Sequence, residues 1–234
     1  MHAESSLLLR WQTVQREIQS ESQRQGRAVP RLVAVSKKQP ASAIAELAGY
    51  GQRDFGENYV QEAADKMDAL ADQRDQLTWH LIGHLQSNKA SMAAQRFDWI
   101  HTVDRMKLIK PLGAARMAVG PSPLNVLIQV NIDDQDSKHG CHVDEIEPLA
   151  TAILETPGLQ LRGLMTIGKA YENPEDARAT FARMFSQFKY LQSRHDLVDT
   201  LSMGMSGDFR QAIDEGSTLI RVGTAIFGQR PAKE

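Results

Sequence analysis

The chain has 234 residues, of which 41% are hydrophobic and 24% are charged, and its formal net charge is −2 at pH 7. This length is enough to bury one complete core, so we expect residues 1–234 to form a single domain. A net charge close to zero gives no electrostatic reason to expect binding to nucleic acid or to a membrane surface.

Two features of the sequence favour a cytoplasmic location. The apolar run nearest the start, Leu7 to Leu9, is too short for the core of a signal peptide, and no stretch approaches the roughly 20 apolar residues of a membrane helix. Cys141 is the single cysteine, which excludes an internal disulfide and suits a reducing compartment.

Helical and strand patterns alternate along the chain. Residues 5–25 carry apolar side chains at helical spacing and predict a helix that is closed by Gly26. Eight short apolar or β-branched segments then predict strands, at residues 32–38, 53–58, 77–86, 98–104, 124–132, 159–168, 199–207 and 218–228. Helical patterns separate these strands, at residues 40–51, 59–70, 90–95, 105–118, 142–156, 174–195 and 208–216.

This alternation predicts an α/β fold with parallel strands joined by right-handed crossovers. Eight strand–helix units favour a single (β/α)8 TIM-type barrel, with an extra N-terminal helix within residues 1–28 packed on it. The alternative is an open doubly wound sheet, which usually carries a glycine-rich turn after its first strand. The corresponding turn here reads Ser-Lys-Lys-Gln-Pro, without glycine, and we therefore favour the barrel.

Lys37 is the strongest candidate for a functional residue. In a barrel, functional side chains lie at the C-terminal ends of the strands, and the first predicted strand ends at this lysine. Side chains alternate along a strand, so Lys37 shares a face with Val33 and Val35, whereas Lys38 faces the other way. Burial beside apolar residues lowers the pKa of a lysine and frees its amine as a nucleophile. The alternative is a solvated lysine that ends a strand, because lysine is usually exposed.

Two segments near the end of the sequence carry the donors of a phosphate site. Residues 204–208 read Gly-Met-Ser-Gly-Asp before a predicted helix, and residues 221–224 read Arg-Val-Gly-Thr. Backbone N–H groups and hydroxyls of this kind bind phosphate, and barrels often place them after strands seven and eight. The glycines alone would also be explained by tight turns. A ligand with an aldehyde at one end and a phosphate at the other, such as pyridoxal 5′-phosphate, would span Lys37 and this phosphate site.

Other candidates are weaker. His80, His84 and His101 lie on or after the third and fourth strands, but nothing near them in the sequence completes a tetrahedral ligand set, so we expect core or rim histidines and no metal site. Lys138 lies in the polar loop 133–140 and is a candidate second amine for exchange of the cofactor. The alternative, which fits the sequence equally well, is that Lys138 is a solvated lysine of this loop.

Eight segments of the chain resemble the pyridoxal phosphate homeostasis proteins. They are AVSKKQP, FGENYVQE, WHLIGHLQSNK, HTVDR, NVLIQVNI, RGLMTIG, LSMGMSGDF and IRVGTAIFG. They extend from about residue 33 to residue 228, over nearly the whole chain. The resemblance implies the barrel domain of alanine racemase, known as fold type III, with pyridoxal 5′-phosphate as its cofactor.

The resemblance also implies roles for individual residues. Lys37 would hold the cofactor as an imine, and Arg221 would face the pyridine nitrogen. Ser206, Gly223 and Thr224 would bind the phosphate. The pocket would further be lined by Asn58, Met165 and His84. The resemblance implies no role for Lys38.

The function implied by the resemblance is non-catalytic: binding of pyridoxal 5′-phosphate in intracellular homeostasis, as a carrier or buffer. An arginine at the pyridine nitrogen disfavours protonation there and makes the ring a poor electron sink. We also expect no second domain to supply an opposing acid–base group. The alternatives are a weak amino-acid racemase, or an aldolase-like barrel that uses Lys37 on a sugar phosphate. We expect a monomer, with cofactor-dependent apo-enzymes as candidate recipients.

Overall fold

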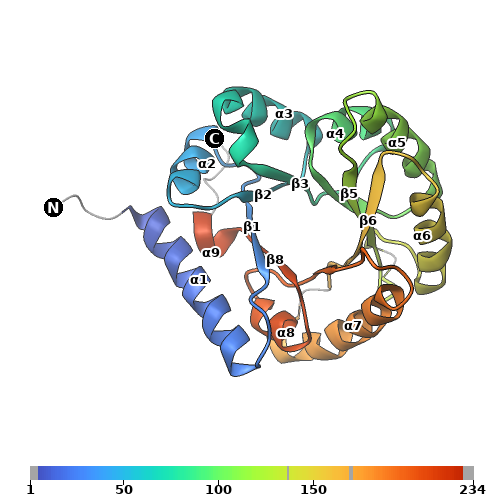
Figure 1. Ribbon diagram of the computed structural model, residues 1–234. Helices are drawn as coiled ribbons and strands as arrows, with labels where there is room; N and C mark the ends of the chain where they lie inside the picture. The colour runs from blue at the N-terminus through green and yellow to red at the C-terminus, as the bar shows by residue number, and fades with distance from the viewer. Residues whose placement is uncertain (1–4, 136, 169–170, 229–234) are drawn as a thin grey trace.

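The computed structural model describes residues 5–135, 137–168 and 171–228, and these residues form a closed barrel of eight parallel strands surrounded by helices (Figure 1). The predicted barrel is therefore confirmed. Each strand pairs with the next one in sequence, and the last pairs with the first, where Val33 is in register with Arg221. No helix in this part of the chain is long and apolar enough to cross a membrane.

The strands are short, and their carboxyl ends face the same rim. Their bounds are β1 Arg31–Val35, β2 Asp54–Glu57, β3 Thr78–Leu81, β4 Trp99–Val103, β5 Leu124–Gln129, β6 Leu159–Met165, β7 Thr200–Ser202 and β8 Leu219–Val222. Alternate residues of each strand face the outer helices and the barrel interior. In β1, for example, Leu32 and Ala34 belong to the large apolar core, whereas Val33 lies between them on the opposite face.

The helices cover the outside of the barrel. The α-helices are α1 Ser6–Arg24, α2 Ala41–Gly49, α3 Val60–Ala69, α4 Ala90–Arg96, α5 Ile109–Met117, α6 Ile146–Leu154, α7 Arg178–Gln192, α8 Phe209–Asp214 and α9 Thr224–Phe227. Short 3₁₀ segments are η1 Ala71–Gln76, η2 Ser87–Lys89, η3 Met106–Leu108, η4 Val143–Glu145 and η5 Pro174–Ala177.

Helix α1 confirms the predicted N-terminal helix and lies alongside α8 and α9 (Figure 1). Its first turn is capped by Ser5, whose hydroxyl accepts a hydrogen bond from the backbone N–H of Leu7. Arg10 donates to the backbone oxygen of Ile226 at 2.7 Å, which fixes α1 to α9.

All eight strands end before their predicted carboxyl ends, and the difference is largest at β8, β7 and β3. The last predicted strand, residues 218–228, ends at Val222, and the backbone oxygen of Gly223 then accepts hydrogen bonds from Ile226 and Phe227 in helix α9. A short apolar run does not distinguish a strand from a buried helix. The seventh strand ends at Ser202, before a turn in which Gly204 has a φ of +91°. The first ends at Val35, so Lys37 lies in a turn.

Candidate functional site

Lys37 lies two residues beyond β1, in a turn that buried polar contacts hold in place. Ser36 is fully buried and its hydroxyl donates to Glu57 Oε1 at 2.6 Å. Lys66 Nζ donates to the same carboxylate oxygen and to the backbone oxygen of Ser36, at 2.8 Å in each case. Two elements, β2 and α3, therefore fix the backbone immediately before Lys37.

The next residue, Lys38, turns the chain away from the barrel. Its φ of 62° lies in the left-handed region, and its backbone N–H donates to Glu62. Lys38 is exposed and Lys37 is half-buried. The two lysines thus differ in burial, but the turn at Lys38 separates them and not alternation along a strand, because β1 ends at Val35.

The Glu57–Lys66 pair was missed by sequence reasoning. Burial raises the pKa of Glu57, and the adjacent Lys66 opposes that rise. Losing one partner of such a pair leaves an uncompensated buried charge, which costs about 3–5 kcal/mol. The sequence signal for a buried charge was Glu57, a glutamate at the end of a short strand. Its partner Lys66 lies on α3 and could be identified only from the fold.

A chain of five polar side chains crosses the barrel interior. Arg221 Nη1 donates to Ser202 Oγ at 2.6 Å, and Ser202 Oγ lies 3.1 Å from His101 Nδ1. His101 Nε2 lies 3.0 Å from His80 Nδ1, and His80 Nε2 lies 2.9 Å from Asp54 Oδ1. The histidines and Ser202 are completely buried.

Arg221 and Asp54, the two end members of this hydrogen-bonded series, determine the direction of every hydrogen bond in it. A guanidinium only donates and an ionised carboxylate only accepts. His80 therefore donates from Nε2 to Asp54 and accepts at Nδ1 from His101. His101 in turn accepts at Nδ1 from the Ser202 hydroxyl, which accepts from Arg221. Burial lowers the pKa of both histidines, which keeps each ring neutral as this arrangement requires.

Arg221 is a buried cation with neutral partners. It is 3% exposed, and its Nη2 donates to the backbone oxygen of Thr166 at 2.9 Å. No carboxylate among the described residues forms an ion pair with it. Burial lowers the pKa of Arg221 to about 10, although Asp208 opposes this shift. A buried guanidinium without a paired carboxylate suits a ligand that brings an acceptor atom.

The loops after β7 and β8 form the phosphate candidate. Within the described ranges, the backbone N–H groups of Ser206, Gly207, Gly223 and Thr224 donate no hydrogen bond, and the hydroxyls of Ser206 and Thr224 are likewise without a protein partner. The loop after β7 is joined to β8 by the hydrogen bond from the backbone N–H of Arg221 to the oxygen of Gly204, at 3.1 Å. This donor set fits a phosphate group.

Strand register brings the predicted residues to one rim. Gly223 lies against Val35, since a Cβ on this glycine would be 3.3 Å from the Val35 backbone oxygen. Asn58 follows β2 and lies against Gly83, where an added Cβ would be 2.2 Å from the Asn58 backbone oxygen. Asn58, Gly83 and His84 line one cavity of about 480 Å³. The candidates thus follow the adjacent strands β7, β8, β1 and β2.

The remaining candidates differ in burial and in their neighbours. Met165 is completely buried at the end of β6, and Lys138 is exposed in the loop after β5. His80 and His101 are core histidines, as expected. No metal-binding partner of His84 lies near it in the sequence, but the fold places Asp104 and a histidine from the loop after β5 beside it.

Comparisons with known proteins agree with this geometry. Residues 11–231 match the family model for the alanine racemase N-terminal domain. The chain is 50% identical over 201 residues to the pyridoxal phosphate homeostasis protein of Escherichia coli strain K12, covering 85% of each chain. A solved structure of PipY from Synechococcus elongatus PCC7942 with PLP bound is 36% identical, with a TM-score of 0.83, over 95% of this chain and 100% of that one.

A more distant structure shares the fold alone. Alanine racemase from Bartonella henselae is 17% identical, with a TM-score of 0.67, over 97% of this chain and 60% of that one. The fold therefore defines a single barrel of the class found at the N-terminus of alanine racemase. Within that class, the chain belongs to the family of pyridoxal phosphate homeostasis proteins.

Proposed function

We propose that this protein binds pyridoxal 5′-phosphate at the carboxyl rim of its barrel and acts in intracellular homeostasis of that cofactor, as a carrier or buffer. The observation that carries the proposal is the set of unengaged phosphate donors at residues 206–207 and 223–224, beside buried Arg221 and the turn that holds Lys37. The homeostasis protein of Escherichia coli and the PLP-bound PipY support it.

Each residue has a separate task in this proposal. Lys37 Nζ would bond to the aldehyde carbon, with loss of the aldehyde oxygen as water, and Ser206, Gly223 and Thr224 would hold the phosphate. Arg221 would donate to the pyridine nitrogen, and Asn58 would line the pocket. When bound, the cofactor supplies the aldehyde and, toward amino acids, an electron sink.

The position of Arg221 favours a carrier over an enzyme. A guanidinium donates and does not give up its proton, so a pyridine nitrogen that accepts from it stays unprotonated. The ring is then a weak electron sink, and removal of a proton from an amino acid is slow. Release and reloading of the cofactor need only the reversible bond to Lys37. We further infer a cytoplasmic monomer that delivers cofactor to apo-enzymes.

The binding proposal is tested by the visible spectrum of the purified protein, followed by borohydride reduction and peptide mapping. We expect the reduced pyridoxyl group on the peptide that contains Lys37, and we expect Lys37→Ala to lose the visible absorbance. Lys38→Ala is the matched control and should keep both. Labelling mainly at Lys38 would refute the assignment.

The carrier proposal is tested by turnover. The holoprotein would be incubated with L-alanine and L-serine in deuterated water, and deuterium at the α-carbon and the chirality of the amino acid would be followed. We expect turnover far below ordinary enzyme rates of about 1–10³ per second. Turnover within that range would establish the racemase alternative instead.

A further inference from the structure

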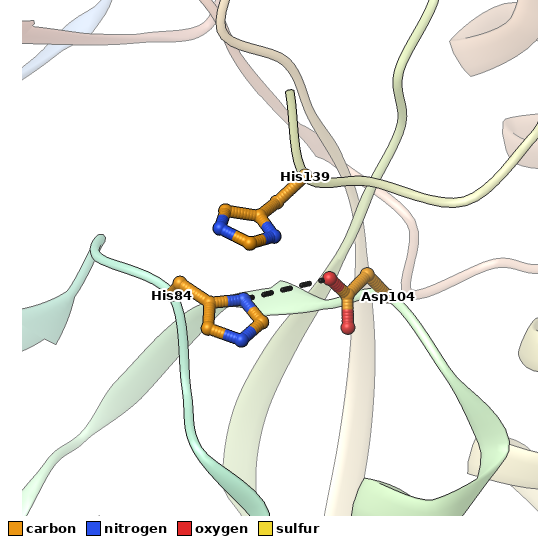
Figure 2. A group of neighbouring side chains, drawn as sticks. All are labelled: His84, Asp104 and His139. Carbon is orange, nitrogen blue, oxygen red and sulfur yellow. Dashed lines mark ion pairs between the residues drawn. The ribbon is translucent and has the colours of Figure 1, made fainter. Parts of the chain in front are cut away.

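Three side chains with metal-binding atoms converge beyond the ends of β3, β4 and β5 (Figure 2). His84 follows β3, Asp104 follows β4, and His139 lies in the loop after β5. Each offers one ligand atom, and the three atoms lie within 4.8 Å of one another. His84 Nδ1 is 3.8 Å from Asp104 Oδ2, and the two imidazole rings stack with their centroids 3.8 Å apart.

The carboxylate is held with one oxygen turned toward the histidines. The Asp104 side chain is 8% exposed, and its Oδ1 is bound by Arg105. Arg105 is itself fixed, because its Nη2 donates to the backbone oxygen of Leu85 at 2.7 Å. Asp104 Oδ2 therefore faces His84, and Arg105 has the position of a group that orients a ligating carboxylate.

The loop that carries His139 is anchored to β5. Gln129 Nε2 donates to the backbone oxygen of His139 at 3.0 Å, and the backbone N–H of Cys141 donates to the Gln129 backbone oxygen at 2.9 Å. Gly140 has a φ of +129°, and an added Cβ would lie 2.5 Å from the Asn131 backbone nitrogen. The backbone is thus fixed on both sides of His139, where the loop comes back to β5.

The chemistry of the cluster suits a divalent transition metal. Both histidines are exposed, so an ion can reach them from solvent. Two imidazoles and a carboxylate, with water in a fourth position, form a recurrent ligand set of Zn²⁺. Ligands about 2.1 Å from a tetrahedral ion are about 3.4 Å apart, so rotation of the exposed His139 ring would close the cluster.

We propose that His84, Asp104 and His139 bind one divalent ion of the Zn²⁺ class. The bound ion joins the loop 131–141 to the ends of β3 and β4. His84 also lines the cavity that contains Asn58, so the ion would lie beside the proposed cofactor site without contributing to it. None of the three ligands holds the phosphate or the aldehyde in the proposed cofactor site.

The test is calorimetric titration of the full chain, freed of any affinity tag and treated with chelator, with Zn²⁺. We expect one equivalent to bind, and His84→Ala and His139→Ala each to weaken binding at least tenfold. The matched control is His142→Ala. His142 is an exposed histidine near the same loop and pairs with Asp134, with 2.7 Å between Nδ1 and Oδ1. This control should bind Zn²⁺ as the unaltered chain does.

Cobalt supplies a second measurement. Co²⁺ should give the visible bands of a tetrahedral ion in the unaltered chain and in His142→Ala, and lose them in His139→Ala. Circular dichroism would confirm that each variant is folded. Absence of stoichiometric Zn²⁺ binding by the unaltered chain would overturn the proposal, as would binding that His142→Ala or Cys141→Ser removes and His139→Ala leaves intact.

Discussion

Ser202→Ala is the substitution that best tests the chain of hydrogen bonds across the barrel. It removes the hydroxyl that accepts from Arg221 at 2.6 Å and lies 3.1 Å from His101 Nδ1, in a completely buried position. A hydrogen bond from a charged group contributes about 1.5–3 kcal/mol, and an unpaired buried acceptor costs about 1–3 kcal/mol. The two effects overlap, so we expect the free energy of unfolding to fall by about 2–3 kcal/mol.

The same substitution should also alter the cofactor site. Without the Ser202 hydroxyl, Arg221 keeps only its contact with the Thr166 backbone oxygen and loses part of its fixed orientation. We expect affinity for pyridoxal 5′-phosphate to fall up to about tenfold, which corresponds to about 1.4 kcal/mol. Unfolding in urea would measure stability, and equilibrium titration of the visible absorbance would measure binding.

Ser217→Ala is the matched control. Ser217 is also buried, and its hydroxyl lies 2.8 Å from the backbone oxygen of Met203 without contacting Arg221. This variant should lose about 1–2 kcal/mol of stability and keep its cofactor affinity. Equal losses of affinity in Ser202→Ala and Ser217→Ala would refute the view that the hydrogen-bonded side chains across the barrel position Arg221.

Three further predictions concern single side chains. Ser206→Ala should weaken pyridoxal 5′-phosphate about tenfold and unphosphorylated pyridoxal much less, since a charged hydrogen bond is worth about 1.5–3 kcal/mol; equal losses in both titrations would exclude a phosphate contact. Lys138→Ala should change the rate at which cofactor is released or transferred to an apo-enzyme, while the borohydride label stays on Lys37; unchanged rates would retire Lys138 as a second amine. Burial raises the pKa of Cys141 to about 12, so only about one thiol in 10⁴ is ionised at pH 8, and disulfide reagents should react with it only after unfolding; rapid reaction with the folded protein would contradict this burial.

The sequence predicted those parts of the site that depend on local residues. Lys37 and Lys38 were expected to have different surroundings and do differ in burial, but β1 ends at Val35 and the difference comes from the turn at Lys38. The glycine and hydroxyl residues after β7 and β8 were likewise recognisable, because phosphate binding depends on local backbone donors. The contacts of cofactor with Lys37, Ser206 and Arg221 stay predictions.

Contacts between distant segments could not be predicted in the same way. His101 and Ser202 are 101 residues apart, and their contact depends on which residues of β4 and β7 face the barrel interior. A strand as short as β7, with three residues, gives too little alternation to assign its faces. His139 reaches His84 only because a glycine with positive φ returns its loop to β5.

The pairing of β8 with β1 has a consequence for how this protein is made. Residues near the beginning of the chain emerge from the ribosome long before Leu219–Val222, yet the barrel closes only when these two strands meet. Until then β1 presents an unpaired edge, which is prone to join other strands. The loops proposed to hold phosphate flank β8, and α9 must also dock on α1. The ability to bind cofactor should therefore be acquired only after β8 has been synthesised and has paired with β1.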